Sequence, residues 1–285
     1  MKTNSIPTVE FGTTGRMVTR VGLGGEGVLR TTGKTDAARK VIRSAIAEGI
    51  TYFDSARVYS DSEVYYGGIW SQDPQARSRV FQASKSASRD KAGARQDLED
   101  TLGRLGVDHL DLWQIHDVRT AEDLSVISGP GGALEAFMEA KEAGKTRFIG
   151  VTGHHDPDIL ARAVRQWPVD SVMMPVNPVE EVLGGFLTKT LPAALDKGIA
   201  VIAMKIFGAG HYIAPHLGVT PELLLRYALS KPITVAIAGC SGVDEVETLA
   251  AAGRLDQPPG KTELRKLMAP FKEDARRLAF YRHFG

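Results

Sequence analysis

The amino-acid sequence predicts a single (β/α)8 barrel, and three observations indicate this fold. The chain has 285 residues with no composition break or low-complexity linker, which suits one domain over residues 1–285. About eight short apolar segments alternate with amphipathic helical ones. Most of the short segments are continuous apolar runs, as expected for parallel strands covered on both faces. Eight such units favour a barrel over a doubly wound sheet, which usually has fewer strands or a second domain.

The first half of the chain supplies a hairpin and four barrel strands. Apolar residues flank the glycine-containing turn at 12–15, so 9–11 and 17–18 are expected to pair as an N-terminal β-hairpin. Apolar runs predict strands at 19–25, 52–54, 80–84 and 110–116. Apolar residues at helical spacing predict helices at 36–48, 60–71 and 91–105. Gly49 and Gly106 are placed to end the first and the last of these helices.

The second half repeats the alternation. Strands are expected at 147–152, 171–174, 199–204 and 233–238. Helices are expected at 134–143, 157–166, 186–197, 221–229 and 244–252, with one or two C-terminal helices over 263–281. The stretch 117–132 is expected to be irregular, and because it follows the fourth strand it would overhang the mouth of the barrel.

Composition narrows the class of protein. The chain is 43% hydrophobic and 24% charged with a net charge of +1, so it has no electrostatic footprint for nucleic acid or an anionic membrane. No apolar run serves as a signal peptide or approaches the roughly 20 residues of a membrane span. The single cysteine, Cys240, excludes an internal disulfide and is expected to be a packing residue. A globular cytoplasmic protein is expected.

Four ionisable side chains come from the ends of three successive predicted strands. Asp54, Lys85 and His116 end the second, third and fourth strands, and Tyr59 lies in the loop after Asp54. Strand ends meet at one mouth of a barrel, so these side chains are expected to gather there. Such a set suits proton transfer to a carbonyl oxygen. Lys85 is expected to lower the pKa of Tyr59, Asp54 to hold Lys85 charged, and His116 to orient the carbonyl.

Each of these residues has a structural explanation when taken alone. Asp54 could cap a turn, Tyr59 could be a surface residue, and Lys85 could be ion-paired. His116 could be a hydrogen-bonded core histidine. Their joint occurrence at three neighbouring strand ends favours a functional site. A Schiff-base aldolase that uses Lys85 or Lys205 is an alternative chemistry for such a barrel.

In these motifs the sequence resembles the aldo-keto reductases, which are barrel oxidoreductases with nicotinamide cofactors. Asp54 and Tyr59 match the family's aspartate and catalytic tyrosine, with Glu63 and Gly67 in the pattern that follows. The segments 83–85 and 114–117 are similar to the family's lysine and histidine segments. The resemblance implies reduction of an aldehyde or ketone, or the reverse oxidation of an alcohol. A non-catalytic, cofactor-binding redox sensor of the same fold is the alternative.

The resemblance also implies where the cofactor is held. Thr152 and Gly153 take the place of the family's Ser-Asn pair, and Asn177 fits its asparagine after the sixth strand. Met173 stands where a glutamine is common. The expected cofactor contacts also include Gly24, at the end of the first strand, and Asp54.

After the seventh strand the family's aromatic residue is replaced by Met204, so either Met204 or Phe207 is left to cover the nicotinamide. Lys205 would face the pyrophosphate, and Gly208 ends this segment. The turn that contains Gly239 and Ser241 precedes a helix and resembles the family's adenosine-phosphate site.

The nature of the cofactor and the absence of a metal are two further expectations. The family resemblance favours NADP(H), whereas the carboxylates of Asp244 and Glu245 repel a 2′-phosphate and leave NAD(H) open. His154 and His155, taken with His211 and His216, match no standard metal-ligand spacing, so no metal is expected. Specificity for a small carbonyl or alcohol substrate is expected to come from 26–33, from 117–132 and from the C-terminal segment.

Overall fold

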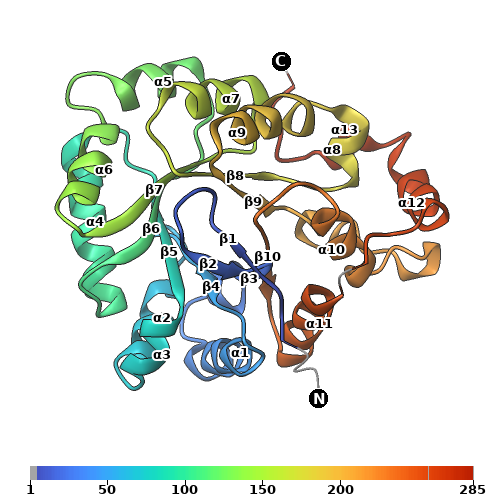
Figure 1. Ribbon diagram of the computed structural model, residues 1–285, viewed down its shortest axis with the longest axis horizontal. Coiled ribbons are helices and arrows are strands. Elements are labelled where there is room, and N and C mark those ends of the chain that lie inside the picture. Colours follow the sequence, from blue (N-terminus) through green and yellow to red (C-terminus); the bar gives the residue numbers. More distant parts are fainter. Residues whose placement is uncertain (1–4, 256, 285) are drawn as a thin grey trace.

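The computed structural model describes residues 5–255 and 257–284, and its eight parallel strands close into a barrel (Figure 1). The strands follow one another around the barrel in chain order, and the last strand pairs with the first. They are β3 (Val21–Gly27), β4 (Tyr52–Asp54), β5 (Phe81–Ser86), β6 (Leu110–Ile115), β7 (Thr146–Thr152), β8 (Ser171–Pro175), β9 (Ala200–Met204) and β10 (Val235–Cys240). All eight predicted strands are present, and the predicted barrel is confirmed.

Helices surround the barrel on its outside, as Figure 1 shows. They are α1 (Thr35–Ala47), α2 (Ser62–Trp70), α3 (Pro74–Arg79), α4 (Lys91–Leu105), α5 (Ala121–Ser128), α6 (Ala133–Glu142), α7 (Pro157–Gln166), α8 (Pro178–Leu183), α9 (Leu191–Lys197), α10 (Pro221–Leu229), α11 (Val243–Arg254), α12 (Lys261–Met268) and α13 (Ala275–Leu278). The predicted helix at 186–197 is a π-helical turn, Phe186–Thr190, that continues into α9. Within the described ranges, no helix has the length and apolarity needed to cross a bilayer.

The N-terminal hairpin closes one end of the barrel. It pairs β1 (Thr8–Glu10) with β2 (Met17–Thr19), as predicted. Phe11, in the turn between them, is fully buried, with its ring centroid 4.7 Å from that of Phe81. It also packs near Tyr52 and Phe148. Because Tyr52 and Phe81 begin their strands, the hairpin forms the floor of the barrel, and the mouth lies at the opposite ends of the strands.

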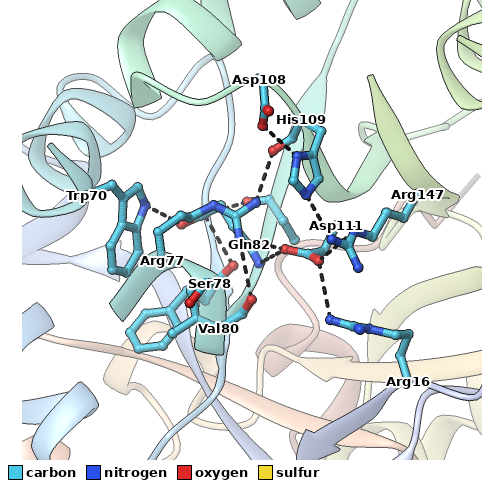
Figure 2. A network of polar contacts seen from close by, with 12 residues as sticks. Arg16, Trp70, Arg77, Ser78, Val80, Gln82, Asp108, His109, Asp111 and Arg147 are labelled. Atoms are coloured by element: carbon cyan, nitrogen blue, oxygen red, sulfur yellow. Dashed lines mark hydrogen bonds and ion pairs between the residues drawn. The ribbon is translucent and has the colours of Figure 1, made fainter. Parts of the chain in front are cut away.

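A polar network at this floor fixes the lower ends of several strands (Figure 2). Its centre is Asp111, whose side chain is 1% exposed. Asp111 Oδ2 accepts hydrogen bonds from Arg77 Nη1 and from the backbone N–H of Gln82, both at 2.9 Å. Asp111 Oδ1 lies 3.4 Å from Arg147 Nε and 4.0 Å from Arg16 Nη2. The network joins α3, β5, β6, β7 and the hairpin, so its role is structural and distant from the mouth.

The prediction that 117–132 is irregular is wrong, because this stretch contains α5. Thr120 caps the helix: its Oγ1 accepts a hydrogen bond from the backbone N–H of Asp123 at 3.0 Å. The Asp123 carboxylate in turn accepts a hydrogen bond from the backbone N–H of Thr120. This reciprocal capping box and the buried pair Leu124 and Ile127, three residues apart, are helix signals that the sequence already contained.

Candidate active site

Asp54 and Lys85 form a buried ion pair at the mouth of the barrel. They end neighbouring strands, since Asp54 on β4 pairs in register with Ala83 on β5. Lys85 Nζ donates to Asp54 Oδ2 at 2.5 Å and to the backbone oxygen of Ser55 at 2.7 Å. The two side chains are 1% and 2% exposed. Burial raises the pKa of Asp54 and lowers the pKa of Lys85, and the ion pair opposes both shifts.

Tyr59 lies directly beside this pair. Lys85 Nζ is 4.9 Å from the centroid of the Tyr59 ring. The His116 ring meets the Tyr59 ring edge-on, at 5.6 Å between centroids and 79° between planes. Close approach of β3 requires a glycine here, because a Cβ on Gly25 would stand 2.6 Å from the Tyr59 ring. The structure therefore brings together all four residues that the sequence singled out.

The expectation of a lowered pKa for Tyr59 is wrong. Burial has the largest effect, and together with the negative charges of Asp54 and Glu26 it raises the pKa of Tyr59 well above its ordinary value. The Asp54 carboxylate offsets the Lys85 ammonium to which it is bound, so burial and the negative charges decide the direction of the shift. Tyr59 consequently keeps its proton at neutral pH.

His116 is held as a neutral imidazole. Burial, and to a smaller extent the charge of Lys85, lowers the pKa of His116 to about 3. Its backbone N–H donates to the Ser86 oxygen at 2.8 Å, and its carbonyl oxygen accepts from Arg89 Nη1 at 2.7 Å. The neutral ring has one N–H to donate, so it can orient an oxygen beside Tyr59 without adding charge.

Two further charged residues, Glu26 and Arg30, lie close to Tyr59. The sequence named them only as part of the segment 26–33. Arg30 Nη1 and Glu26 Oε1 form an ion pair at 2.8 Å. The Arg30 guanidinium carbon lies 4.9 Å from the Tyr59 ring centroid, within range of a cation–π contact. Their spacing of four residues, across the end of β3, is the sequence signal that identifies the pair.

Glu63, which follows Tyr59 in the family-like pattern, supports the site from behind. Its side chain is fully buried, and Oε1 accepts hydrogen bonds from Ser84 Oγ at 2.7 Å and from Thr101 Oγ1 at 2.8 Å. Arg104 Nε lies 3.2 Å from Oε2. Glu63 therefore connects α2 to α4 and to Ser84, the residue before Lys85. This contact helps to fix the part of β5 from which the Lys85 side chain projects.

Thr152, Gly153 and Asn177, expected to contact the cofactor, hold the loops after β7 and β8. Thr152 Oγ1 accepts from the backbone N–H of Asp117 at 2.8 Å, and the Gly153 N–H donates to the Met173 oxygen at 3.2 Å. Asn177 Oδ1 caps α8 by accepting from a backbone N–H. Its Nδ2 donates to the Lys205 oxygen at 3.0 Å. These residues shape the mouth, and their contact with a cofactor remains a prediction.

The segments after β9 and β10 form the other side of the mouth. Met204 and Phe207 are partly exposed there. Lys205 has φ +56°, and Gly208 has φ +53° where a Cβ would lie 2.4 Å from the Tyr212 ring. These left-handed conformations hold the segment in one tight path.

The turn after β10 already binds an anionic oxygen. The Ser241 backbone N–H donates to Glu245 Oε2 at 2.6 Å, at the N-terminus of α11. The same N–H chemistry would bind a phosphate oxygen, so the turn fits the predicted phosphate site. Close packing of β3 on β10 also requires Gly24 and Gly239, because a Cβ on Gly24 would stand 3.0 Å from Ala238, and one on Gly239 would stand 2.6 Å from Glu26.

Burial and contacts describe three further sets of residues. Cys240 is buried and its pKa is raised to about 12 by burial, so it is a packing residue as expected. Trp70 is 2% exposed, and its Nε1 donates to Gln82 Oε1 in the polar network of Figure 2. His154 and His155 group with Asp117: their Nε2 atoms lie 3.3 Å and 3.8 Å from Asp117 Oδ1.

Comparisons with known proteins all identify the same family. Residues 20–214 match the model of the aldo/keto reductase family. L-galactose dehydrogenase of Arabidopsis thaliana is 26% identical over 85% of this chain and 86% of its own length. 6-Dehydroglucose reductase of Novosphingobium aromaticivorans is 28% identical over 64% of this chain and 63% of its own.

Solved structures show the same fold. The holo form of an aldo-keto reductase from Bacillus halodurans has a TM-score of 0.75 at 20% identity and covers 98% of both chains. An aldo/keto reductase of Klebsiella pneumoniae, in complex with NADP and acetate, has a TM-score of 0.72 at 23% identity over 93% of this chain and 95% of its own. With the barrel and the family-model match over 20–214, these comparisons show that the chain belongs to the aldo/keto reductase family.

Proposed function

We propose that this protein reduces an aldehyde or ketone with NAD(P)H, or catalyses the reverse oxidation, with Tyr59 as proton donor. The observation that carries the proposal is the placement of Tyr59 between the Lys85–Asp54 ion pair and His116. A bound nicotinamide supplies the hydride in reduction and accepts it in oxidation. The protein's own groups then have to orient the carbonyl and move one proton.

The four residues divide this work. Tyr59 carries its proton at neutral pH and can donate it to the oxygen that gains electrons at the carbonyl. Neutral His116 donates an N–H to the same oxygen and sets its angle. Lys85, fixed by Asp54 and by the Ser55 carbonyl, places a positive charge close to the tyrosinate that forms on proton transfer.

The cofactor is proposed to be NADP(H), held by the turn after β10 and by Lys205. The Ser241 N–H, which binds Glu245 here, would bind a phosphate oxygen if the Glu245 side chain swings away. Asp244 and Glu245 in the first turn of α11 disfavour a 2′-phosphate. NADP in the Klebsiella relative supports the first choice, and NAD(H) is the alternative that binding measurements separate.

The named relatives suggest a substrate class. L-galactose dehydrogenase and 6-dehydroglucose reductase carry sugar names, so sugar carbonyls and hydroxyls are the first compounds to test. Arg30, half-exposed beside Tyr59, offers a hydrogen-bond donor to hydroxyl or anionic oxygens at the mouth.

The alternatives have less support. Lys85 is 1% exposed and its ammonium is bound to Asp54 and to the Ser55 carbonyl, which argues against a Schiff base on this lysine. The two named relatives are a dehydrogenase and a reductase, which favours catalysis over a purely sensing role.

Tyr59→Phe tests the proposal. Removal of the phenol hydroxyl should lower kcat by roughly 10²–10⁴-fold on a panel of sugar and simple aldehydes, the range of general acid catalysis. The affinity for NADPH and NADH, measured by the quenching of tryptophan fluorescence, should be unchanged in the variant. Full activity in Tyr59→Phe, or no binding of either cofactor to the unmodified chain, would overturn the proposal.

A further inference from the structure

We propose that Asp117, His154 and His155 bind one divalent ion of the Zn²⁺ class at the barrel mouth, beside His116. The three side chains come from the ends of β6 and β7, and their ligand atoms all lie within 4.8 Å of one another. Two imidazole nitrogens and one carboxylate oxygen are the donor set that borderline first-row ions prefer.

The separations suit such an ion. His154 Nε2 lies 3.3 Å from Asp117 Oδ1, and His155 Nε2 lies 3.8 Å from the same oxygen. Bonds of about 2.0–2.2 Å to a tetrahedral ion place neighbouring ligand atoms roughly 3.3–3.6 Å apart. The pair of His154 and Asp117 already has this spacing, and the distance from His155 to Asp117 exceeds it by a few tenths of an ångström.

The hydrogen bonds around the site leave the metal-binding atoms free. His154 Nδ1 lies 3.2 Å from the Tyr281 carbonyl oxygen, which can only accept, so Nδ1 carries the proton and Nε2 presents a lone pair. This is the orientation that a backbone carbonyl commonly imposes on metal-binding histidines. Asp117 Oδ2 accepts from Arg119 Nε at 2.7 Å. Asp117 Oδ1 is buried and has no hydrogen-bond partner among the described residues.

The backbone holds these side chains in place. Asp117 has φ +58°, a conformation that a residue other than glycine rarely adopts, and its N–H is fixed by Thr152 Oγ1. The His155 carbonyl oxygen accepts from the backbone N–H of His283, and Tyr281 holds His154. The C-terminal segment thus holds the imidazole of His154 and the backbone of His155. An unpaired carboxylate oxygen that faces an imidazole lone pair is repulsive unless a proton or a cation lies between them.

The experiment distinguishes a metal site from a histidine–aspartate pair that only shares a proton. Chelator-treated full-length protein is titrated with Zn²⁺ by calorimetry at neutral pH, without nicotinamide or substrate. We expect one ion per chain, and affinity at least tenfold weaker in His154→Ala and in Asp117→Asn. The matched control is His216→Ala, which removes an exposed histidine from the mouth-side loop after β9. It should bind as the unmodified chain does.

Two further measurements separate a loss of binding from a loss of folding. Circular dichroism of the metal-free variants checks their fold, and Co²⁺ titration of the unmodified chain should give visible d–d absorption that His155→Ala changes. Absence of saturable binding, or equal binding in His154→Ala, Asp117→Asn and His216→Ala, would overturn the proposal. Since no measurement requires turnover, a failure of the proposed reductase activity leaves the result interpretable.

Discussion

The ammonium of Lys85 and the carboxylate of Asp54 are both removed from water, and neither is stable there without the other. We expect Lys85→Met to lower the free energy of unfolding by about 3–5 kcal/mol, because it leaves a buried carboxylate unpaired. The double variant Asp54→Asn/Lys85→Met should recover a large part of this loss. Urea denaturation of Lys85→Met, of Asp54→Asn and of the double variant measures the coupling energy. Additive losses would show that the pair is not coupled.

His116 predicts a pH dependence of stability. Its pKa is lowered to about 3 in the folded protein, against an ordinary value of about 6.5 when unfolded. Between these values the unfolded chain binds a proton that the folded chain does not, so stability falls as pH decreases from about 6.5 toward 3. At pH 5 this one residue should cost about 2 kcal/mol relative to high pH.

His116→Asn tests this dependence. The free energy of unfolding should fall less steeply between pH 7 and pH 5 in the variant than in the unmodified chain, by about 2 kcal/mol over that interval. Identical slopes in the variant and the unmodified chain would contradict the lowered pKa.

The sequence identified Asp54, Tyr59, Lys85 and His116 because each lies at or just beyond the end of an apolar run, and parallel strand ends converge. It could not give the direction of the Tyr59 pKa shift. That direction depends on burial and on Glu26, which reaches the tyrosine from another strand end. The grouping of His154 with Asp117 depends in the same way on where separate loops turn.

Among the elements, α2 and α4 cross at an unusually small separation at Gly67. A Cβ on Gly67 would stand 2.2 Å from the Arg104 carbonyl oxygen, so the two helices would have to move apart. We expect Gly67→Ala to lower the free energy of unfolding by about 1–3 kcal/mol. The control is Gly103→Ala in α4, where a Cβ meets nothing within 4 Å. It should stabilise the protein by about 0.5–1 kcal/mol, and opposite signs in a denaturant titration are the expected result.

The elements that the sequence predicted well are those with a strong repeating pattern. The barrel strands are continuous apolar runs, and the helices between them carry apolar residues at helical spacing. The short helix α5 was missed because it has only eight residues and a turn rich in glycine and proline, 129–132, follows it directly. Its capping box would have identified it. The paths after β6 and β9 depend on the left-handed residues Asp117 and Lys205, which leave no pattern in the sequence.

For the whole molecule, the floor of the barrel is separate from its mouth. Phe11 is fully buried against the first residues of the strands, and we expect Phe11→Ala to cost about 3–5 kcal/mol in the free energy of unfolding. Met17, in the same hairpin, is 56% exposed, so Met17→Ala should change little. Thermal denaturation compares the two variants. Cofactor binding by folded Phe11→Ala should be normal, and a selective loss of binding would contradict the separation of floor and mouth.

The two ends of the described chain lie on opposite sides of this barrel. The hairpin occupies the floor, while Tyr281 and His283 are bonded to loop residues at the mouth, Asn177 and His155. A linker to a solid support, placed before the hairpin, would turn the mouth toward the solution. One placed after the last helix would crowd it. An electrode or bead coated through the N-terminal side should therefore present more molecules with an accessible mouth.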